Sequence, residues 1–268
     1  MKTISIIGAG NMGGAIARGL AQGSIFAAEN ITVCDISEAN LSAITKFNPR
    51  ICTSLSNVEG VKNADIVVIA VKPWLTEPIL DEIKSVLNYD SQLLVSIVAG
   101  ISFDQMYSFL EKDDESTTPT IFRVIPNTAI DVLQSVSTIA SSNASKEQEQ
   151  EILSIFNELG KAFLVPSESQ LNAFMSLSSC GIAYAFRYIR AAMEGGVEMG
   201  MYPEVAKQVV LQTLRGAVEL LEKNGTHPEV EIDKVTTPGG ITIKGLNELE
   251  AQGFSNAVIK GLKASFLK

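Results

Sequence analysis

The sequence contains few of the residues on which metal, thiol and nucleic-acid chemistry depend. It has one histidine, His227, and three cysteines, Cys34, Cys52 and Cys180, which are widely spaced and form no CxxC pair. We therefore expect neither a metal site nor a disulfide framework. Acidic residues outnumber basic residues by 30 to 21, which gives a formal net charge of -9. This charge, without any basic patch, argues against a nucleic-acid partner.

Long hydrophobic runs are also missing from the sequence. The mostly apolar run from Ile4 to Ile7 is far too short for a signal peptide or a membrane span. We therefore expect a cytoplasmic protein without a membrane partner. With 268 residues, 46% of them hydrophobic, the chain is long enough for one large domain or two ordinary ones.

The first part of the chain alternates short β-branched runs with helical segments, which is typical of a parallel sheet flanked by helices. Among the predicted helices, the segment that begins at Ser145 has the form of a capping box, with Gln148 three residues on. The sequence thus predicts an α/β fold class with an N-terminal Rossmann-type parallel sheet domain over residues 1–165. The predicted strands are Ile4–Gly8, Ile31–Asp35, Asp65–Val71, Leu93–Val98, Ile121–Val124, Ser135–Ala140 and Ala162–Val165, and the predicted helices include Met12–Gln22, Ser37–Lys46, Leu75–Leu87 and Ser145–Leu159.

The remaining residues, 166–268, show only helical periodicity, which predicts an all-helical second domain. Its long helices are expected over Gln170–Met199, Pro203–Lys223 and Ile241–Lys268. These segments carry more apolar positions than one helical layer can hide, so we predict a homodimer, or a higher oligomer, that forms through them. The alternative is that the apolar stripe forms an ordinary core within one chain.

A glycine-rich turn near the N-terminus predicts a dinucleotide site. The sequence Gly8-Ala9-Gly10-Asn11-Met12-Gly13 follows an apolar strand and opens a helix, the context that the GxGxxG motif needs. Gly8 allows the tight turn, Gly10 lets the main chain approach a pyrophosphate, and Gly13 lets the helix pack on the strand. A plain strand-to-helix turn is the alternative.

Other predicted cofactor residues follow later strands. Asp35 ends the second strand, where a carboxylate accepts hydrogen bonds from the adenosine ribose, and this favours NADH over NADPH. It could instead cap the next helix, although Ser37 suits that role better. Ala70, Val71, Lys72 and Pro73 follow the next predicted strand, and Gly100 follows the one after, where it could admit the nicotinamide ribose; taken singly, each is only a strand terminus.

A second glycine turn, within Val235-Thr236-Thr237-Pro238-Gly239-Gly240-Ile241-Thr242-Ile243, predicts an anion site beside a hydroxyl group. Two glycines behind a proline expose the backbone just before Thr242 begins a helix. Backbone N–H groups at Gly240, Ile241 and Thr242 can bind a small carboxylate without an arginine. The alternative for Thr242 is a helix cap that binds no ligand.

These residues together resemble the pyrroline-5-carboxylate reductase family over nearly the whole chain. The second glycine turn is the most specific of the matching segments. The others are the turn Gly8–Gly13, Ala70–Pro73, Ser96–Gly100, Arg123–Thr128, Ala183–Phe186, Glu194–Val197, Gly245-Leu246 and Leu249-Glu250.

The resemblance implies a Rossmann domain, a helical dimerisation domain, and an active site between them that is completed across the dimer. The implied reaction is reduction of the C=N bond of 1-pyrroline-5-carboxylate to L-proline with NADPH or NADH. By position, Gly8–Met12, Asp35, Asn57 and Ala70–Pro73 are expected to hold the cofactor, and Gly239–Thr242 the substrate carboxylate. Thr242 stands where the family has its active-site threonine.

The sequence also departs from the family pattern, and two other functions stay open. Ser179, Cys180 and Ile182 replace a Gly-Ser-Gly-Pro pattern in part, Ala129 replaces a common proline, and Ile241 replaces a smaller residue. One alternative is a carbonyl-reducing β-hydroxyacid-type dehydrogenase, which needs a proton-donating lysine such as Lys207 or Lys244. The other is a non-catalytic nucleotide-binding relative. The lone His227, in a turn, is expected to be structural.

Overall fold

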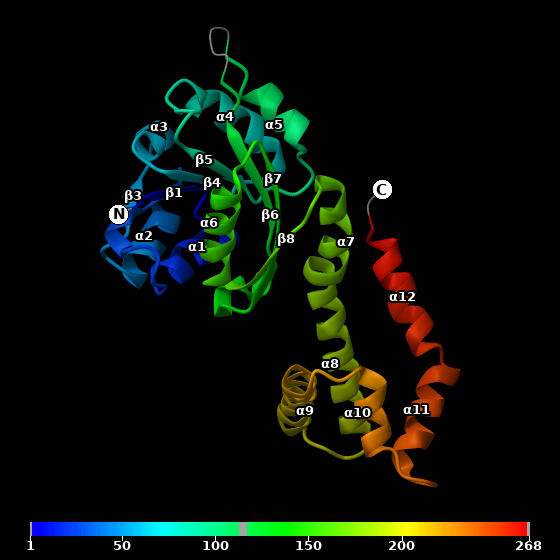
Figure 1. The fold of residues 1–268 in the computed structure, drawn as a ribbon. Helices are drawn as coiled ribbons and strands as arrows, with labels where there is room; N and C mark the ends of the chain where they lie inside the picture. Colours follow the sequence, from blue (N-terminus) through cyan, green and yellow to red (C-terminus); the bar gives the residue numbers. More distant parts are fainter. Residues whose placement is uncertain (1, 113–116, 267–268) are drawn as a thin grey trace. The chain divides into compact units, whose positions relative to one another are not determined.

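The structure, a computed structural model, describes residues 2–112 and 117–266 of the chain. It falls into two compact units, Met1–Ser179 and Cys180–Lys268 (Figure 1). The first unit contains the whole sheet, and the second is entirely helical apart from its connecting turns in the described residues. No helix among the described residues has both the length and the apolar character needed to cross a bilayer.

The sheet of the first unit has eight strands in the order β3-β2-β1-β4-β5-β6-β7-β8. Strands β1 to β6 are mutually parallel, β7 runs antiparallel to β6, and β8 is parallel to β7. This arrangement confirms the predicted Rossmann-type sheet. The strands are β1 Ile4–Ile7, β2 Ile31–Cys34, β3 Cys52–Ser54, β4 Ile66–Ile69, β5 Leu93–Ser96, β6 Thr120–Ile125, β7 Ser135–Ser142 and β8 Gly160–Leu164.

All seven predicted strands are present, but the sequence did not reveal β3. This strand has three residues, lies at the edge of the sheet, and its side chains are exposed or half-buried. It therefore has no hydrophobic run by which it could be recognised. The central strands β1 and β4 are buried at every position, which explains their continuous β-branched sequences.

Helices cover both faces of the sheet, as the two separate hydrophobic cores show. The first core packs α1 (Asn11–Leu20), α2 (Glu38–Phe47) and α6 (Lys146–Asn157) on one face. The second packs α3 (Asn57–Val61), α4 (Thr76–Lys84) and α5 (Phe103–Phe109) on the other. Short helical turns η1 (Ala28–Asn30), η2 (Pro73–Leu75), η3 (Thr128–Val132) and η4 (Glu168–Gln170) connect the elements.

Polar caps start several helices where the sequence predicts them. Ser145 and Gln148 form the expected capping box at α6. Ser37 Oγ accepts from the Asn40 N–H group (3.3 Å) and so caps α2, which removes the alternative role of helix cap from Asp35.

The helical unit contains α8 (Gly181–Glu198), α9 (Pro203–Asn224), α10 (Pro228–Val235), α11 (Ile241–Ala251) and α12 (Phe254–Ala264). The single helix predicted from Ile241 is divided in two, because Gly253 adopts a positive φ of 81° between α11 and α12. Its predicted end at Lys268 lies outside the described residues.

The chain leaves the sheet at Leu164, whereas the compact units divide only after Ser179. The reason is that α7 (Leu171–Met175) still packs on the second core of the sheet unit, where Leu171 is buried. A π-helix, Ser176–Cys180, follows α7 and contains the point of division. The division at residue 165 therefore stays a prediction.

Candidate functional site

The predicted cofactor residues lie at one edge of the sheet. Because β1 to β5 are parallel, their carboxyl ends lie at the same edge, where open α/β sheets bind ligands. Gly8 follows β1, Asp35 follows β2, Asn57 follows β3, Ala70 follows β4 and Gly100 follows β5. The fold thus brings together residues that are up to 92 positions apart in the sequence, from Gly8 to Gly100.

The turn between β1 and α1 is so tightly packed that two of its positions admit only glycine. Gly8 has a φ of 103°, and a Cβ atom there would lie 2.5 Å from the Ala70 carbonyl oxygen. A Cβ atom at Gly13 would lie 1.9 Å from the Gly8 carbonyl oxygen and 2.9 Å from Ala70 Cβ. These two glycines therefore fix the close approach of α1 to β1 and β4.

The third glycine of the turn, Gly10, is open instead of crowded. No atom lies within 4 Å of a Cβ atom built at Gly10, and this residue precedes α1 without a side-chain cap. No acidic residue occupies the first turn of α1. The first N–H groups of α1, at Asn11 and Met12, thus follow an uncrowded residue and carry the partial positive charge of a helix N-terminus. This arrangement fits the pyrophosphate of a dinucleotide.

Asp35 is fixed against the glycine turn by its own hydrogen bonds. Its Oδ2 atom accepts from the Ala9 N–H group (2.6 Å), and its Oδ1 atom accepts from the Ser37 N–H group (2.8 Å). The Asn40 side chain adds a longer contact to Oδ2 (3.4 Å). The carboxylate is therefore held at the end of β2, next to the turn that would bind the pyrophosphate.

Asn57 has a partner that the sequence did not suggest. It is buried, and its Nδ2 atom donates to Glu82 Oε2 (2.9 Å), a side chain from α4. Glu82 lies 25 residues further along the chain and belongs to no motif, so only the packing of α3 against α4 reveals the pair. The hydrogen bond to Glu82 thereby fixes the orientation of the Asn57 side-chain amide.

The residues that follow β4 and β5 include exposed side chains and accessible backbone. The Ala70 N–H group donates to the Ile7 carbonyl (2.8 Å), which continues the pairing of β1 with β4 beyond the strand. Val71 is half-buried, Lys72 and Pro73 are exposed, and Trp74, the one tryptophan, is 73% exposed. Gly100 has a φ of 81° with no atom near its Cβ position, so its backbone is accessible.

The second glycine turn, in the helical unit, is a type II β-turn. The Gly240 N–H group donates to the Thr237 carbonyl (2.9 Å), with Pro238 and Gly239 at the two central positions. Gly239 has a φ of 71°, which the third residue of such a turn requires. The Pro-Gly pair therefore has a local structural reason that is independent of any ligand.

The turn leads directly into the uncapped N-terminus of α11. Gly240 is the N-cap residue without a side-chain hydrogen bond, and the first turn of α11 has no acidic residue. Contrary to expectation, the Gly240 N–H group is not free, because it closes the turn. The first N–H groups of the helix, at Ile241 and Thr242, remain, and the Ile241 side chain is 87% exposed. The turn thus offers helix-end donors and the Thr242 hydroxyl group.

Two of the family departures, Ser179 and Cys180, lie on the π-helix, a rare conformation that often marks functional sites. The others, Ala129, Ile182 and Ile241, lie on η3, α8 and α11. The Ser179 hydroxyl group donates to the Pro126 carbonyl (3.0 Å), and Asn127 Nδ2 donates to the Ser178 carbonyl (3.4 Å). Cys180, at the end of the π-helix, is half-buried. The π-helix is therefore hydrogen-bonded to the loop that follows β6.

His227 has a structural role, as expected. Its Nδ1 atom accepts from the Glu229 N–H group (3.3 Å) and caps α10. The buried Cys34 thiol has a raised pKa because burial disfavours the thiolate. Neither residue offers a reactive group to the candidate site.

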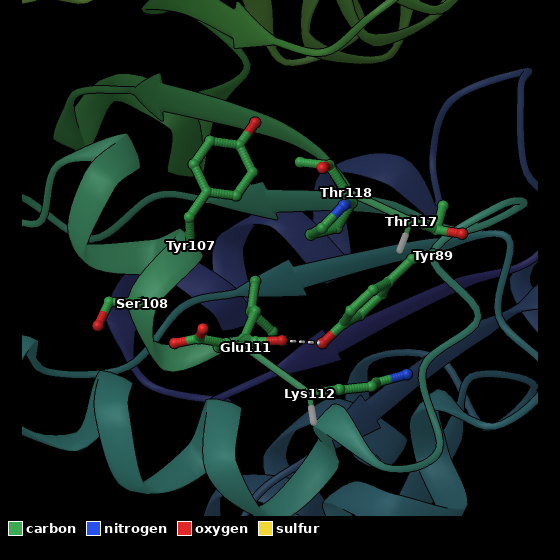
Figure 2. Close-up of a pocket in the computed structure, with 9 residues that line it drawn as sticks. Tyr89, Tyr107, Ser108, Glu111, Lys112, Thr117 and Thr118 are labelled. Atoms are coloured by element: carbon green, nitrogen blue, oxygen red, sulfur yellow. Dashed lines mark hydrogen bonds between the residues drawn. The ribbon is translucent and has the colours of Figure 1, made fainter. Parts of the chain in front are cut away.

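A cavity lies elsewhere, around residues that precede β6. Figure 2 shows Tyr89, Tyr107, Lys112 and Thr118 around it, and the Tyr89 hydroxyl group donates to the Leu110 carbonyl (2.6 Å). Since β5 and β6 are parallel, this cavity is at the amino ends of the strands, opposite the cofactor edge. We therefore do not assign the cofactor to it.

Together the sheet edge and the two glycine turns define a class of protein, the dinucleotide-dependent oxidoreductases with a Rossmann domain and a helical domain. Residues 3–100 match the family described as NADP oxidoreductase coenzyme F420-dependent, and residues 168–268 match pyrroline-5-carboxylate reductase dimerisation. The chain belongs to the pyrroline-5-carboxylate reductase family.

Relatives and solved structures support this assignment over the full chain. A reductase from Methanosarcina acetivorans is 35% identical and covers 98% of this chain and 97% of its own length. Reductase 1 of Dictyostelium discoideum is 38% identical over 98% of this chain, which spans only 48% of that longer relative. The structure of the Plasmodium falciparum enzyme with NADP bound has a TM-score of 0.85 and 29% identity, and it covers 98% of this chain and 95% of its own.

Proposed function

We propose that this chain reduces the C=N bond of 1-pyrroline-5-carboxylate to L-proline, with NADH or NADPH as the reductant. The observation that carries the proposal is the pair of uncapped helix N-termini, each preceded by a glycine turn, on two different units. The turn at α1 suits a pyrophosphate, and the turn at α11 suits a small carboxylate. The names of full-length relatives support this pairing of ligands.

In this proposal the sheet unit holds the cofactor. Gly8, Ala9, Gly10, Asn11 and Met12 surround the pyrophosphate, with Asp35 and Asn57 toward the adenosine. The segment Ala70 to Pro73 and the accessible backbone of Gly100 lie toward the nicotinamide end. When bound, the reduced nicotinamide supplies hydride.

The helical unit holds the substrate through Gly239, Gly240, Ile241 and Thr242. The helix-end N–H groups bind the carboxylate, which explains why no arginine is needed there. Thr242 hydrogen-bonds the ring nitrogen and selects the ring face that is reduced. A cyclic imine is basic enough to be protonated near neutral pH, so the site can act by positioning and charge placement without a strong acid.

We also propose that the chain acts as a homodimer through its helical unit. Within residues 180–266, only Gly196 and Ala206 are buried in the single chain. Large apolar side chains on α9, such as Val209 and Leu220, are about half exposed. A monomer rarely leaves so many apolar residues in water.

The reaction is tested by following the loss of NADH or NADPH absorbance with 1-pyrroline-5-carboxylate and with a panel of 2-oxo acids, and the gain of absorbance from NAD+ or NADP+ with 3-hydroxy acids. Turnover with the imine alone supports the proposal. Turnover with the oxo acids alone would indicate a β-hydroxyacid-type dehydrogenase, and cofactor binding without any turnover would indicate a non-catalytic relative.

The role of Thr242 is tested by the substitution Thr242→Ala. It should lower kcat/KM about tenfold to a hundredfold, since an oriented hydrogen bond is worth roughly 1.5 to 3 kcal/mol, and it should leave cofactor affinity unchanged. Thr242→Ser should retain most activity. Thr45→Ala, a helical threonine of the sheet unit, is the matched control. Full activity in Thr242→Ala would contradict the assigned role.

A further inference from the structure

The residues after β2 determine which nicotinamide dinucleotide fits, because NADPH differs from NADH only by a phosphate on the adenosine ribose. We propose that this chain selects NADH and that Asp35 and Ile36 set this specificity by excluding the 2′-phosphate. The inference rests on the proposed function, since it assumes that the sheet edge binds a dinucleotide. The proposed function allows either cofactor, whereas this inference specifies NADH and names the residues responsible.

The first step is that the Asp35 carboxylate cannot turn away from the ribose position. Each of its oxygen atoms is held by a backbone N–H group, from Ala9 at 2.6 Å and from Ser37 at 2.8 Å. One of these groups belongs to the glycine turn and the other to the start of α2. A carboxylate that is held on both sides keeps its negative charge at the end of β2, where ribose hydroxyl groups can still donate to its remaining lone pairs.

The second step is that this segment has no cation to neutralise a phosphate. Residues 36–45 contain no lysine or arginine, and Glu38 adds a second acidic residue. Ile36, the residue after Asp35, is 88% exposed and can offer a phosphate only an apolar side chain. The arginine of α1, Arg18, is already paired, because its guanidinium group donates a hydrogen bond to Asp131 (2.6 Å).

The third step is that two of the local N–H groups are already used. The start of α2 could otherwise bind a phosphate, but Ser37 Oγ accepts from the Asn40 N–H group and Asp35 accepts from that of Ser37. A 2′-phosphate would therefore meet a fixed like charge, with no lysine or arginine in residues 36–45 to neutralise it. Repulsion between the Asp35 carboxylate and the 2′-phosphate discriminates against NADPH more strongly than the mere lack of a favourable contact would.

The wild-type full chain gives the first test. Without substrate, the fluorescence of the reduced nicotinamide reports the Kd of NADH and of NADPH separately. We expect NADH to bind at least about tenfold more tightly, as a like-charge contact implies, and kcat/KM with the imine to follow the same order. Equal binding, or tighter binding of NADPH, would overturn the inference. If neither cofactor supports imine reduction, the proposed function fails, and the ratio of the two Kd values still decides the inference.

Two substitutions test the residues themselves. Ile36→Arg places a cation beside the ribose position and should tighten NADPH binding about tenfold while changing NADH binding little, because arginine is well suited to phosphate. Ile25→Arg is the matched control, since Ile25 is also exposed (42%) but precedes β2 at the opposite edge of the sheet. An equal effect of both variants on NADPH binding would refute the assignment of Ile36.

Asp35→Asn tests the charge. It keeps an acceptor for one N–H group but removes the negative charge, so the ratio of the two Kd values should fall toward one. A ratio that stays at the wild-type value in a folded Asp35→Asn protein would show that Asp35 does not set the specificity. Circular dichroism shows whether the Asp35→Asn variant is folded. If it is not folded, the Ile36→Arg variant, which changes an exposed residue, tests the proposed specificity instead.

Discussion

At the scale of single residues, substitutions of two glycines of the first turn, Gly10 and Gly13, are predicted to have different effects. Gly13→Ala should lower the free energy of unfolding by about 2 kcal/mol or more, because its Cβ atom overlaps the Gly8 carbonyl oxygen at 1.9 Å and cannot be accommodated without moving α1. Gly10→Ala should leave stability nearly unchanged, because no atom lies within 4 Å. Urea unfolding of both variants measures this difference.

Cofactor binding by the same two variants completes the comparison. Gly10→Ala should weaken NADH binding although it folds normally, since its methyl group stands where the pyrophosphate must approach the backbone. If Gly10→Ala bound NADH as tightly as the wild type, the open space at Gly10 would not be the pyrophosphate position.

At the scale of secondary-structure elements, the carboxylate of Glu158 is predicted to stabilise the loop after α1. Glu158 Oε1 accepts from the Ser24 hydroxyl group (2.9 Å) and from the Ile25 N–H group (3.0 Å), and so joins the end of α6 to the approach to β2. Glu158→Ala should cost about 1 kcal/mol of stability, because it removes these hydrogen bonds although water can reach the exposed donors. Glu151→Ala, which breaks only the exposed pair with Lys2, should cost less than about 0.5 kcal/mol. Equal losses in denaturant unfolding would contradict this ranking.

Glu231 is predicted to make the junction of α9 and α10 sensitive to acid. Hydrogen bonds from Lys234, Thr226 and Asn224 lower the pKa of Glu231 to about 2 from its ordinary value of 4.5. A lowered pKa contributes stability that is fully present above about pH 4.5 and is lost as the pH falls toward 2. Glu231→Gln should therefore lower the melting temperature at pH 6 and have a smaller effect near pH 3. Glu229→Gln, in the same helix, is the control, and a pH-independent effect of Glu231→Gln would exclude this explanation.

The elements also show what the sequence can and cannot reveal. Strands β1 and β4 were predictable because every residue is buried, and the capping box at Ser145 was predictable because it is local. Strand β3 was not, since an exposed edge strand of three residues has no pattern. Gly253 divides a continuous helical periodicity only through its positive φ, which hydrophobic spacing does not encode.

The same distinction applies to the candidate site. Its glycines and Asp35 were found because motif spacing along the chain reflects one strand-to-helix unit. Glu82, the partner of Asn57, was not found, because their contact depends on the packing of two helices and on no sequence spacing. The N–H group of Gly240 was wrongly expected to be free, since the sequence shows that a turn is present but not which donor closes it.

At the scale of the whole molecule, the helical unit is predicted to depend on a second copy of the chain. Val209 and Leu220 lie 11 residues apart on α9, three helical turns, so they share one face, and both are about half exposed in the single chain. If that face is covered by a partner, the wild type should sediment as a dimer at micromolar concentration, and its melting temperature should rise with protein concentration. The double variant Val209→Glu, Leu220→Glu should sediment as a monomer and melt at a lower temperature, because two carboxylates cannot be buried in an apolar interface without partners. Phe47→Glu, which changes an exposed apolar residue of the sheet unit, should remain dimeric. A wild-type monomer whose melting temperature is independent of concentration would exclude the dimer, and the apolar residues of α9 would then have to be explained within one chain.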